Sequence, residues 1–504
     1  MTKILRFSGI VSLFLLFNSI LFCQTDYGKL DAYINKAVQD FNIPGLAVGI
    51  VKNGQIVFSK GYGLRNTETG DPVTPETIFG LASVSKAFTA ACIGILVDEG
   101  KINWDDKVTD HLSWFKLHDP YVTRELTVRD LLCHRSGLAT FDGDLLWYAT
   151  DYSREEIVKR ISLLPLKNGF REKYGYQNVM YITAGEVIKA VTGKTWDEFV
   201  QERIFTPLNM SSSNTSTSEY SSGKNWSFPH IEGKPLRFLD YDNSGPAASI
   251  NSSVNDLLNW LMMWLNKGKF NDTLILSEAA ISVITSPHLV LNSGQGNEIM
   301  GTHFRNYGLG WALYDYSGRK IIEHSGGLPG VHTKAAIVPE DSLGIVILSN
   351  QINFLINPLL KKILDYHLND KDVDYAAEAL QNFNKYLAET EEKRKKKEES
   401  RIKETFPSLL LKEYAGLYED KMYGKAEVTF SGSELILTLL PTKELFTSKM
   451  EHWHYNTFRI KFADPFLPEG LVTFDFNPDG NISGFKIDLP NPDFHFYNLN
   501  FKKK

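Results

Sequence analysis

The sequence predicts an α+β fold, in which a five-stranded antiparallel sheet flanked by helices is followed by a charged helical linker and an all-β domain. The first sign is a pair of apolar runs, 46–51 and 56–58, joined through Asn-Gly, a strong hairpin signal. The second sign is a set of three more strand-like runs that close the first domain: 320–324, 332–338 and 343–349. The third sign is a change of the apolar period to two after residue 406.

Helices are expected between the two sets of strands, where apolar residues recur at helical spacing. Such a sheet brings both ends of the domain together and leaves the helices to cover its faces. Gly100 and Gly193 follow two of the helical patterns as natural C-caps. The predicted helices, including one ahead of the hairpin, cover 27–42, 83–98, 126–132, 179–191, 195–210 and 254–265.

Three segments have other patterns. Residues 211–245 are rich in Ser, Asn and Gly and predict a long surface loop, of the kind that often forms a lid or substrate wall. Residues 371–405 predict a charged helical linker, because the basic run 393–397 is offset by flanking glutamates. The following β domain, 406–504, has predicted strands at 426–430, 435–440, 458–462, 471–476 and 485–489.

The composition is that of an ordinary globular protein of several domains. The chain has 504 residues, 43% of them hydrophobic and 23% charged. The net charge of −6 and the lack of a basic stripe give no sign of nucleic-acid binding. His452 and His454 have no acidic or cysteine neighbours, so we expect surface strand residues there and predict neither a metal ion nor a cofactor.

The N-terminus has the pattern of a secretory signal peptide, predicted at 1–24 and followed by the first folded domain at 25–370. A basic start precedes an apolar run, 10–22, that is too short and too soon followed by polar residues for a stable membrane span. We therefore expect a secreted or periplasmic protein without a transmembrane span in the mature chain. Lipidation of Cys23 is disfavoured, because the bulky Phe22 precedes it.

Two cysteines remain in the predicted mature chain, Cys92 and Cys133. They allow one optional disulfide but no disulfide framework, and whether they pair stays open. Cys92 lies within the apolar helix and is expected to be a small buried hydrophobic residue.

The helix that begins near Ser83 carries the strongest sign of chemistry. Ser83 and Lys86 are three residues apart, so their side chains share one helix face. The helix is apolar almost all round, which predicts burial, and burial lowers the pKa of a lysine toward the range of a general base. Ser-x-x-Lys also occurs five more times, for instance at Ser113 and Lys116, so the tetrapeptide alone carries little weight.

The order of three motifs adds the missing context. Ser83-x-x-Lys86 is followed by Tyr176-x-Asn178 and then by His324-Ser325-Gly326 at a strand end. This order resembles the serine β-lactamase and penicillin-binding-protein family, in its class C-like branch of D,D-peptidases, D-aminopeptidases and esterases. The resemblance covers most of residues 25–365. It implies the β-lactamase/transpeptidase-like fold, followed by the small barrel-like domain that trails many relatives.

The resemblance also implies roles for these residues. Ser83 would be the nucleophile of an acyl-enzyme, and Lys86 and Tyr176 would share the base role, with the lysine ammonium lowering the tyrosine pKa. Asn178 would hold the lysine and the substrate amide. The oxyanion hole would consist of the backbone N–H groups of Ser83 and Gly327, with glycine letting substrate approach the strand.

His324 departs from the family pattern, because members that handle β-lactams usually carry lysine at this position. A neutral histidine offers no permanent cation to a substrate carboxylate. The sequence therefore predicts an exported serine hydrolase for amides or esters, with His324, Ser325 and Gly326 binding substrate. A D,D-peptidase or D-aminopeptidase-like activity on a small molecule or peptide, such as one derived from peptidoglycan, is the first expectation. The alternatives are an esterase or β-lactamase, or a non-turnover penicillin-binding or peptide-binding sensor; the oligomeric state stays open.

Overall fold

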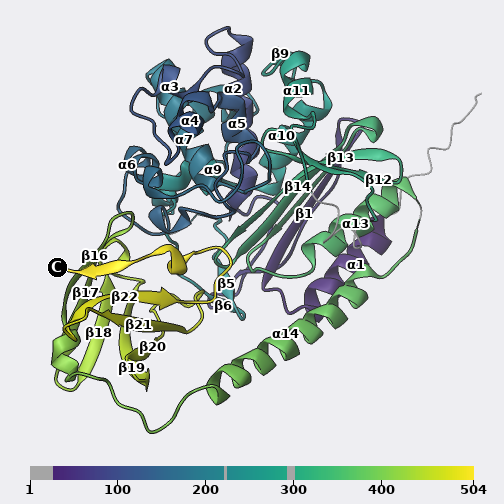
Figure 1. Cartoon of the computed structure of the whole chain (residues 1–504). Coiled ribbons are helices and arrows are strands. Elements are labelled where there is room, and N and C mark those ends of the chain that lie inside the picture. Colours follow the sequence, from purple (N-terminus) through teal and green to yellow (C-terminus); the bar gives the residue numbers. More distant parts are fainter. Residues whose placement is uncertain (1–26, 221–223, 292–300, 370) are drawn as a thin grey trace, which may run out of the picture.

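The computed structural model describes residues 27–220, 224–291, 301–369 and 371–504, so the expected signal peptide lies outside it. Figure 1 shows a large sheet with helices on both sides, a long helix, and a barrel at the C-terminal end. The predicted fold class is confirmed. None of the helices in the described ranges has the length and apolar content needed to cross a bilayer.

The sheet has nine strands in the order β10-β11-β12-β13-β14-β15-β1-β2-β3. The five predicted strands form its continuous centre and are β13 (Arg319–Leu328), β14 (Val331–Val338), β15 (Leu343–Ser349), β1 (Gly45–Lys52) and β2 (Gln55–Asn66). Pairing of β1 with β15, from Leu46 opposite Ser349 to Lys52 opposite Leu343, joins the two ends of the domain as expected. The Asn53-Gly54 turn has positive φ at both residues, as a two-residue hairpin of this type requires.

Four outer strands were not predicted, so the expected number of five strands is too low. They are β3 (Asp71–Pro72), β10 (Leu289–Val290), β11 (Arg305–Tyr307) and β12 (Ala312–Tyr316). Each has at most five residues, too few to show a period in the sequence. Further short two-stranded pairs are β4 (Phe79–Gly80) with β7 (Asn251–Ser252), β5 (His230–Ile231) with β6 (Lys234–Pro235), and β8 (Lys269–Phe270) with β9 (Thr273–Leu274).

The helices divide between the two faces of the sheet (Figure 1). One face packs against α1 (Tyr27–Asp40) and α13 (Ile356–Leu368) in one apolar core. The other carries the larger helical layer, whose centre is the fully buried part of α2 (Ser85–Asp98). The remaining helices are α3 (Val108–His111), α4 (Pro120–Glu125), α5 (Val128–Leu132), α6 (Arg154–Arg160), α7 (Asn178–Thr192), α8 (Trp196–Val200), α9 (Gly245–Ala248), α10 (Val254–Leu265) and α11 (Glu278–Ile284).

The segment 211–245 was expected to be a surface loop, and that is only partly right. It has little regular structure, but Trp226, His230 and Tyr241 are buried in it. Three aromatic contacts, including Tyr220 stacked on Phe238 with ring centroids 3.5 Å apart, hold the segment against itself. Because segment 211–245 has a low apolar content, its sequence did not predict that these few large side chains are buried.

The linker is mainly helical and the C-terminal domain is mainly β, as predicted. Helix α14 (Tyr375–Glu399) packs on α13 at its start and then extends toward the barrel (Figure 1). Eight strands form a closed barrel. Three of them, β16, β19 and β23, were not predicted. Its strands are β16 (Gly416–Asp420), β17 (Gly424–Ser431), β18 (Glu434–Leu439), β19 (Thr447–His454), β20 (Thr457–Ile460), β21 (Gly470–Phe476), β22 (Ile482–Asp488) and β23 (Phe501–Lys503).

Candidate active site

Ser83 lies in a single 3₁₀ turn, Ala82–Val84, directly before α2. The helix was expected to include Ser83 but begins at Ser85. Ala82 has a φ of 50°, in the left-handed region that costs a non-glycine residue about 1–2 kcal/mol. The preceding residue, Leu81, is held by two hydrogen bonds. Its N–H donates to Ile250 O at 2.7 Å, and its carbonyl oxygen accepts from Thr333 Oγ1 at 2.7 Å. The sharp turn thereby presents Ser83 at the end of the buried helix.

Lys86 is fully buried and has three polar partners. Its Nζ donates to Asn178 Oδ1 at 2.6 Å, to Ala247 O at 3.0 Å and to Ser83 Oγ at 3.1 Å. Burial lowers the pKa of Lys86 to about 7, against the opposing effect of Asp144. The expected general-base character of the lysine therefore has a physical cause in the structure.

Tyr176 and Asn178 complete this wall of the site. Asn178 is the first residue of α7 rather than a loop residue, and its Nδ2 donates to Asp144 Oδ2 at 2.6 Å. Burial raises the pKa of Asp144 to about 8. Asn178 therefore bridges Lys86 and a buried carboxyl group that no sequence motif had indicated.

Burial raises the pKa of Tyr176 well above its usual value, and the opposing effect of the Ser83 side chain is smaller. This contradicts the expectation of a lowered tyrosine pKa. The Lys86 Nζ lies 4.7 Å from the centre of the Tyr176 ring, over its face, so it meets the π-system. Tyr176 is consequently a protonated donor near neutral pH.

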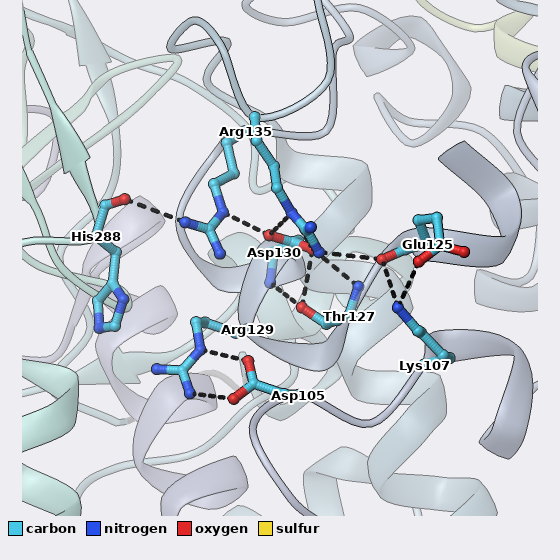
Figure 2. A network of polar contacts seen from close by, with 9 residues as sticks. Asp105, Lys107, Glu125, Thr127, Arg129, Asp130, Arg135 and His288 are labelled. Atoms are coloured by element: carbon cyan, nitrogen blue, oxygen red, sulfur yellow. Dashed lines mark hydrogen bonds and ion pairs between the residues drawn. The ribbon is translucent and has the colours of Figure 1, made fainter. Parts of the chain in front are cut away.

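Figure 2 shows a network of polar contacts around Asp130, Thr127 and Arg135. Asp130 in α5 is fully buried and accepts hydrogen bonds from Arg135 at 2.5 Å and Arg171 at 2.6 Å. The two arginines belong to separate segments. A backbone hydrogen bond from the Arg171 N–H to Arg135 O, 2.9 Å long, also connects these segments. His134, next to Arg135, accepts the Gln177 N–H on Nδ1 at 3.0 Å and lies 4.3 Å from Tyr176 between ring centres. The network thus fixes the position of Tyr176.

His324, Ser325, Gly326 and Gly327 all lie on β13, opposite the Ser83 turn. Strand β12 pairs with β13 only as far as Glu323, so the stretch from His324 to Leu328 pairs with β14 alone. A side chain at Gly326 would meet Leu81 O at 2.1 Å, whereas one at Gly327 would project into open space. Gly326 therefore permits the close approach to the Ser83 turn, and Gly327 leaves room for substrate.

The His324 ring is neutral and already engaged. Its Nδ1 lies 2.6 Å from Ser325 O and must carry the proton, so Nε2 accepts from the Tyr307 hydroxyl at 2.8 Å. Burial lowers the pKa of His324 to about 3. The nearby Lys334 is buried in a pair with Glu323 at 2.9 Å. The third motif therefore offers no cation to a substrate.

A pocket of about 430 Å³ joins these groups, and its far wall comes from the barrel. Ser83, Tyr176, Asn178 and the residues 324–327 line it, together with Asp144 and three barrel residues. Sequence reasoning could not find the three barrel residues, because they belong to no motif and lie far from the other lining residues along the chain. They are Phe466, Asp493 and Phe494.

Comparison with known proteins shows the family to which the chain belongs. The Beta-lactamase family matches residues 30–354, and a domain of unknown function, DUF3471, matches residues 400–503. The chain belongs to the Beta-lactamase family. It is 28% identical over 484 residues to the Unguisins hydrolase ungD' of Aspergillus campestris, covering 89% of this chain and 87% of the relative. With the Protein flp of Staphylococcus aureus strain COL it shares 25% identity over 69% of this chain and 66% of that one.

The fold of this family member also occurs in solved structures. The octameric penicillin-binding protein homologue from Pyrococcus abyssi superposes with a TM-score of 0.60 at 23% identity, over 95% of this chain and all of that one. The family and its hydrolase relatives identify the chain as a hydrolase of this superfamily. Cys92 and Cys133 are both buried and free, which settles their pairing. Within the described ranges, no group of three or more His, Cys, Asp or Glu residues could hold a metal ion.

Proposed function

We propose that this hydrolase acts through an acyl-enzyme on Ser83 and cleaves amides or esters. The observation that carries the proposal is the Lys86 amine, buried, with a pKa of about 7, and 3.1 Å from the Ser83 hydroxyl. Near neutral pH a large share of the enzyme then has an unprotonated amine beside the nucleophile.

The roles follow from the protonation states. Unprotonated Lys86 takes the proton of Ser83 Oγ as the oxygen attacks the substrate carbonyl carbon. The developing oxyanion accepts from the backbone N–H groups of Ser83 and Gly327. Tyr176, which keeps its proton, donates it to the leaving nitrogen or oxygen and receives the lysine proton in exchange. Water then attacks the acyl carbonyl, its proton passes to Lys86, and the Ser83 oxygen is released and reprotonated.

The substrate is proposed to be a peptide bond of a peptidoglycan-type or D-amino-acid peptide, with an ester as the second choice. A true β-lactamase is less well supported, because the neutral His324 leaves the third motif without the cation that binds a substrate carboxylate. The name of the fungal relative supports hydrolysis, but the unguisins it names are not carried over to this chain.

Export is part of the proposal, on the sequence of residues 1–24 alone. Fractionation of expressing cells, with N-terminal sequencing of the product, tests it. A mature chain that begins near residue 25 outside the cytoplasm is the expected result, and a full-length cytoplasmic chain would contradict it.

The deciding experiment follows the intact-protein mass during incubation with a fluorescent penicillin and, separately, with a p-nitrophenyl ester. Turnover of the ester without a lasting penicillin adduct indicates an esterase-like hydrolase. A persistent adduct on Ser83 indicates a penicillin-binding peptidase or sensor. If neither an adduct nor turnover were observed, this result would contradict the acyl-enzyme and favour a binding protein.

A further inference from the structure

A second pocket, here called the α14 groove, opens next to the catalytic pocket. It has a volume of about 450 Å³ and lies between the loop 350–355, α13 and the first turns of α14. Figure 1 shows the two helices side by side at this end of the sheet. His332 and Ile352 line both pockets. Because Ile352 is 43% exposed, it forms a shared rim rather than a buried partition, so one extended ligand can reach both pockets.

The walls of the α14 groove are mainly apolar. Phe354 is 44% exposed, and contacts with Phe383 and Tyr386, at 5.1 and 5.4 Å between ring centres, hold its ring in place. Further apolar lining comes from Pro358, Tyr375 and Ala379. A contiguous apolar surface of this kind beside a cleft is typical of a binding groove. The surface is therefore suited to a large apolar group.

His332 supplies a hydrogen-bond acceptor where the two pockets meet. Its Nδ1 lies 3.0 Å from Asn353 O, which can only accept, so Nδ1 carries the proton and Nε2 has the lone pair. Burial lowers the pKa of His332 to about 4, so the ring stays neutral near pH 7. Among the residues that the structure describes, none donates a hydrogen bond to Nε2. A peptide N–H is the complementary group.

The position of the α14 groove matches the acyl side of the substrate. Tyr176, the proposed proton donor to the leaving group, lies near His324, with ring centres 6.3 Å apart. Gly327, whose N–H is proposed to bind the oxyanion, is paired with His332 of the neighbouring strand. The leaving group therefore lies toward His324, and the part of the substrate on the other side of the carbonyl points toward His332.

We propose that the α14 groove is a specificity subsite for a large apolar side chain on the acyl part of a peptide substrate, with His332 accepting a backbone N–H. The inference rests on the proposed acyl-transfer function and narrows its substrates to peptides with an apolar residue before the attacked carbonyl unit. Most of the lining, from Asn357 to Asn382, lies between the two matched family regions, so neither family describes this subsite.

The test compares two substrates that differ by one benzyl group, acetyl-phenylalanyl-D-alanine p-nitroanilide and acetyl-glycyl-D-alanine p-nitroanilide. Wild-type enzyme is expected to have a kcat/KM about tenfold to a hundredfold higher with the phenylalanyl peptide, because the groove buries its ring. Ala379→Trp fills the groove and should remove this preference. Ala377→Trp, at an exposed position of the same helix outside the groove, is the matched control and should keep both the preference and the rates.

Binding separates this inference from the proposed chemistry. Calorimetric titration of Ser83→Ala protein should show tighter binding of the phenylalanyl peptide, and adding Ala379→Trp should remove the difference. If wild-type enzyme hydrolysed neither peptide nor any ester, the acyl-enzyme would fail, while this difference in binding would still support the subsite. Equal affinity of the Ser83→Ala protein for the two peptides, binding of neither, or a preference that survives Ala379→Trp would overturn it.

Discussion

The two walls of the pocket differ in how the sequence specifies them. The wall formed by α2, α7 and β13 has its groups in short motifs, and buried contacts within one domain fix their geometry. The barrel wall has no motif, and its position depends on the packing of Phe494 and the bonds to Asp142 across the domain boundary. In this molecule the reactive groups are specified locally, whereas the shape and charge around the substrate depend on how two domains meet.

Replacing Ser83 by alanine tests the first wall and should have the largest effect. Turnover is expected to fall on the order of 1,000-fold or more, because the nucleophile is gone. The melting temperature should stay nearly unchanged, since Lys86 keeps its bonds to Asn178 and Ala247. The measurement is ester or anilide hydrolysis together with a thermal melt.

Ser113→Ala is the matched control, because Ser113 and Lys116 repeat the Ser-x-x-Lys pattern and both residues are exposed. It should leave the rate at the wild-type value. Hydrolysis by Ser83→Ala at that same rate would show that another group is the nucleophile.

These two serines also show what could be predicted from the sequence. Ser83 was distinguished from Ser113 by the apolar helix behind it and by the order of the later motifs, and the five central strands followed from their apolar runs. The direction of the tyrosine pKa could not be predicted, because it depends on the burial of Tyr176 and on the lysine lying over its ring. Asp144 and Asp493 could not be found, since only the folded chain brings them to Ser83.

The pH dependence of acylation tests the protonation state of the first wall. Below about pH 7 the buried Lys86 holds a proton and cannot accept another, so kcat/KM should fall about tenfold for each unit of decreasing pH. Above pH 7 it should level off, because Tyr176 keeps its proton well beyond this range. Ester hydrolysis from pH 5 to 9, corrected for the spontaneous reaction, measures this. A rate that kept rising through pH 9 would mean that the base has the pKa of an ordinary lysine or tyrosine.

Tyr148→Phe tests the second wall through its stability. The Tyr148 hydroxyl donates to Asp464 Oδ2 at 2.7 Å, and both residues are buried between the domains. Removing the donor leaves a buried carboxylate without this partner, so the free energy of unfolding should fall by about 1–3 kcal/mol. Denaturant unfolding measures the change, with Tyr497→Phe on the exposed barrel surface as control. Equal stability of the two variants would mean that the interface does not depend on this bond.

The smallest effect is expected from the exposed ion pair across the same interface. Arg237 and Glu444 lie 3.0 Å apart, but their side chains are 57% and 70% exposed. Water and salt screen such a pair, so a double-mutant cycle with Arg237→Gln and Glu444→Gln should give a coupling of about 0.2–1 kcal/mol that decreases with added salt. A coupling above that of the buried Tyr148–Asp464 pair would mean that surface charge, rather than buried packing, holds the barrel wall.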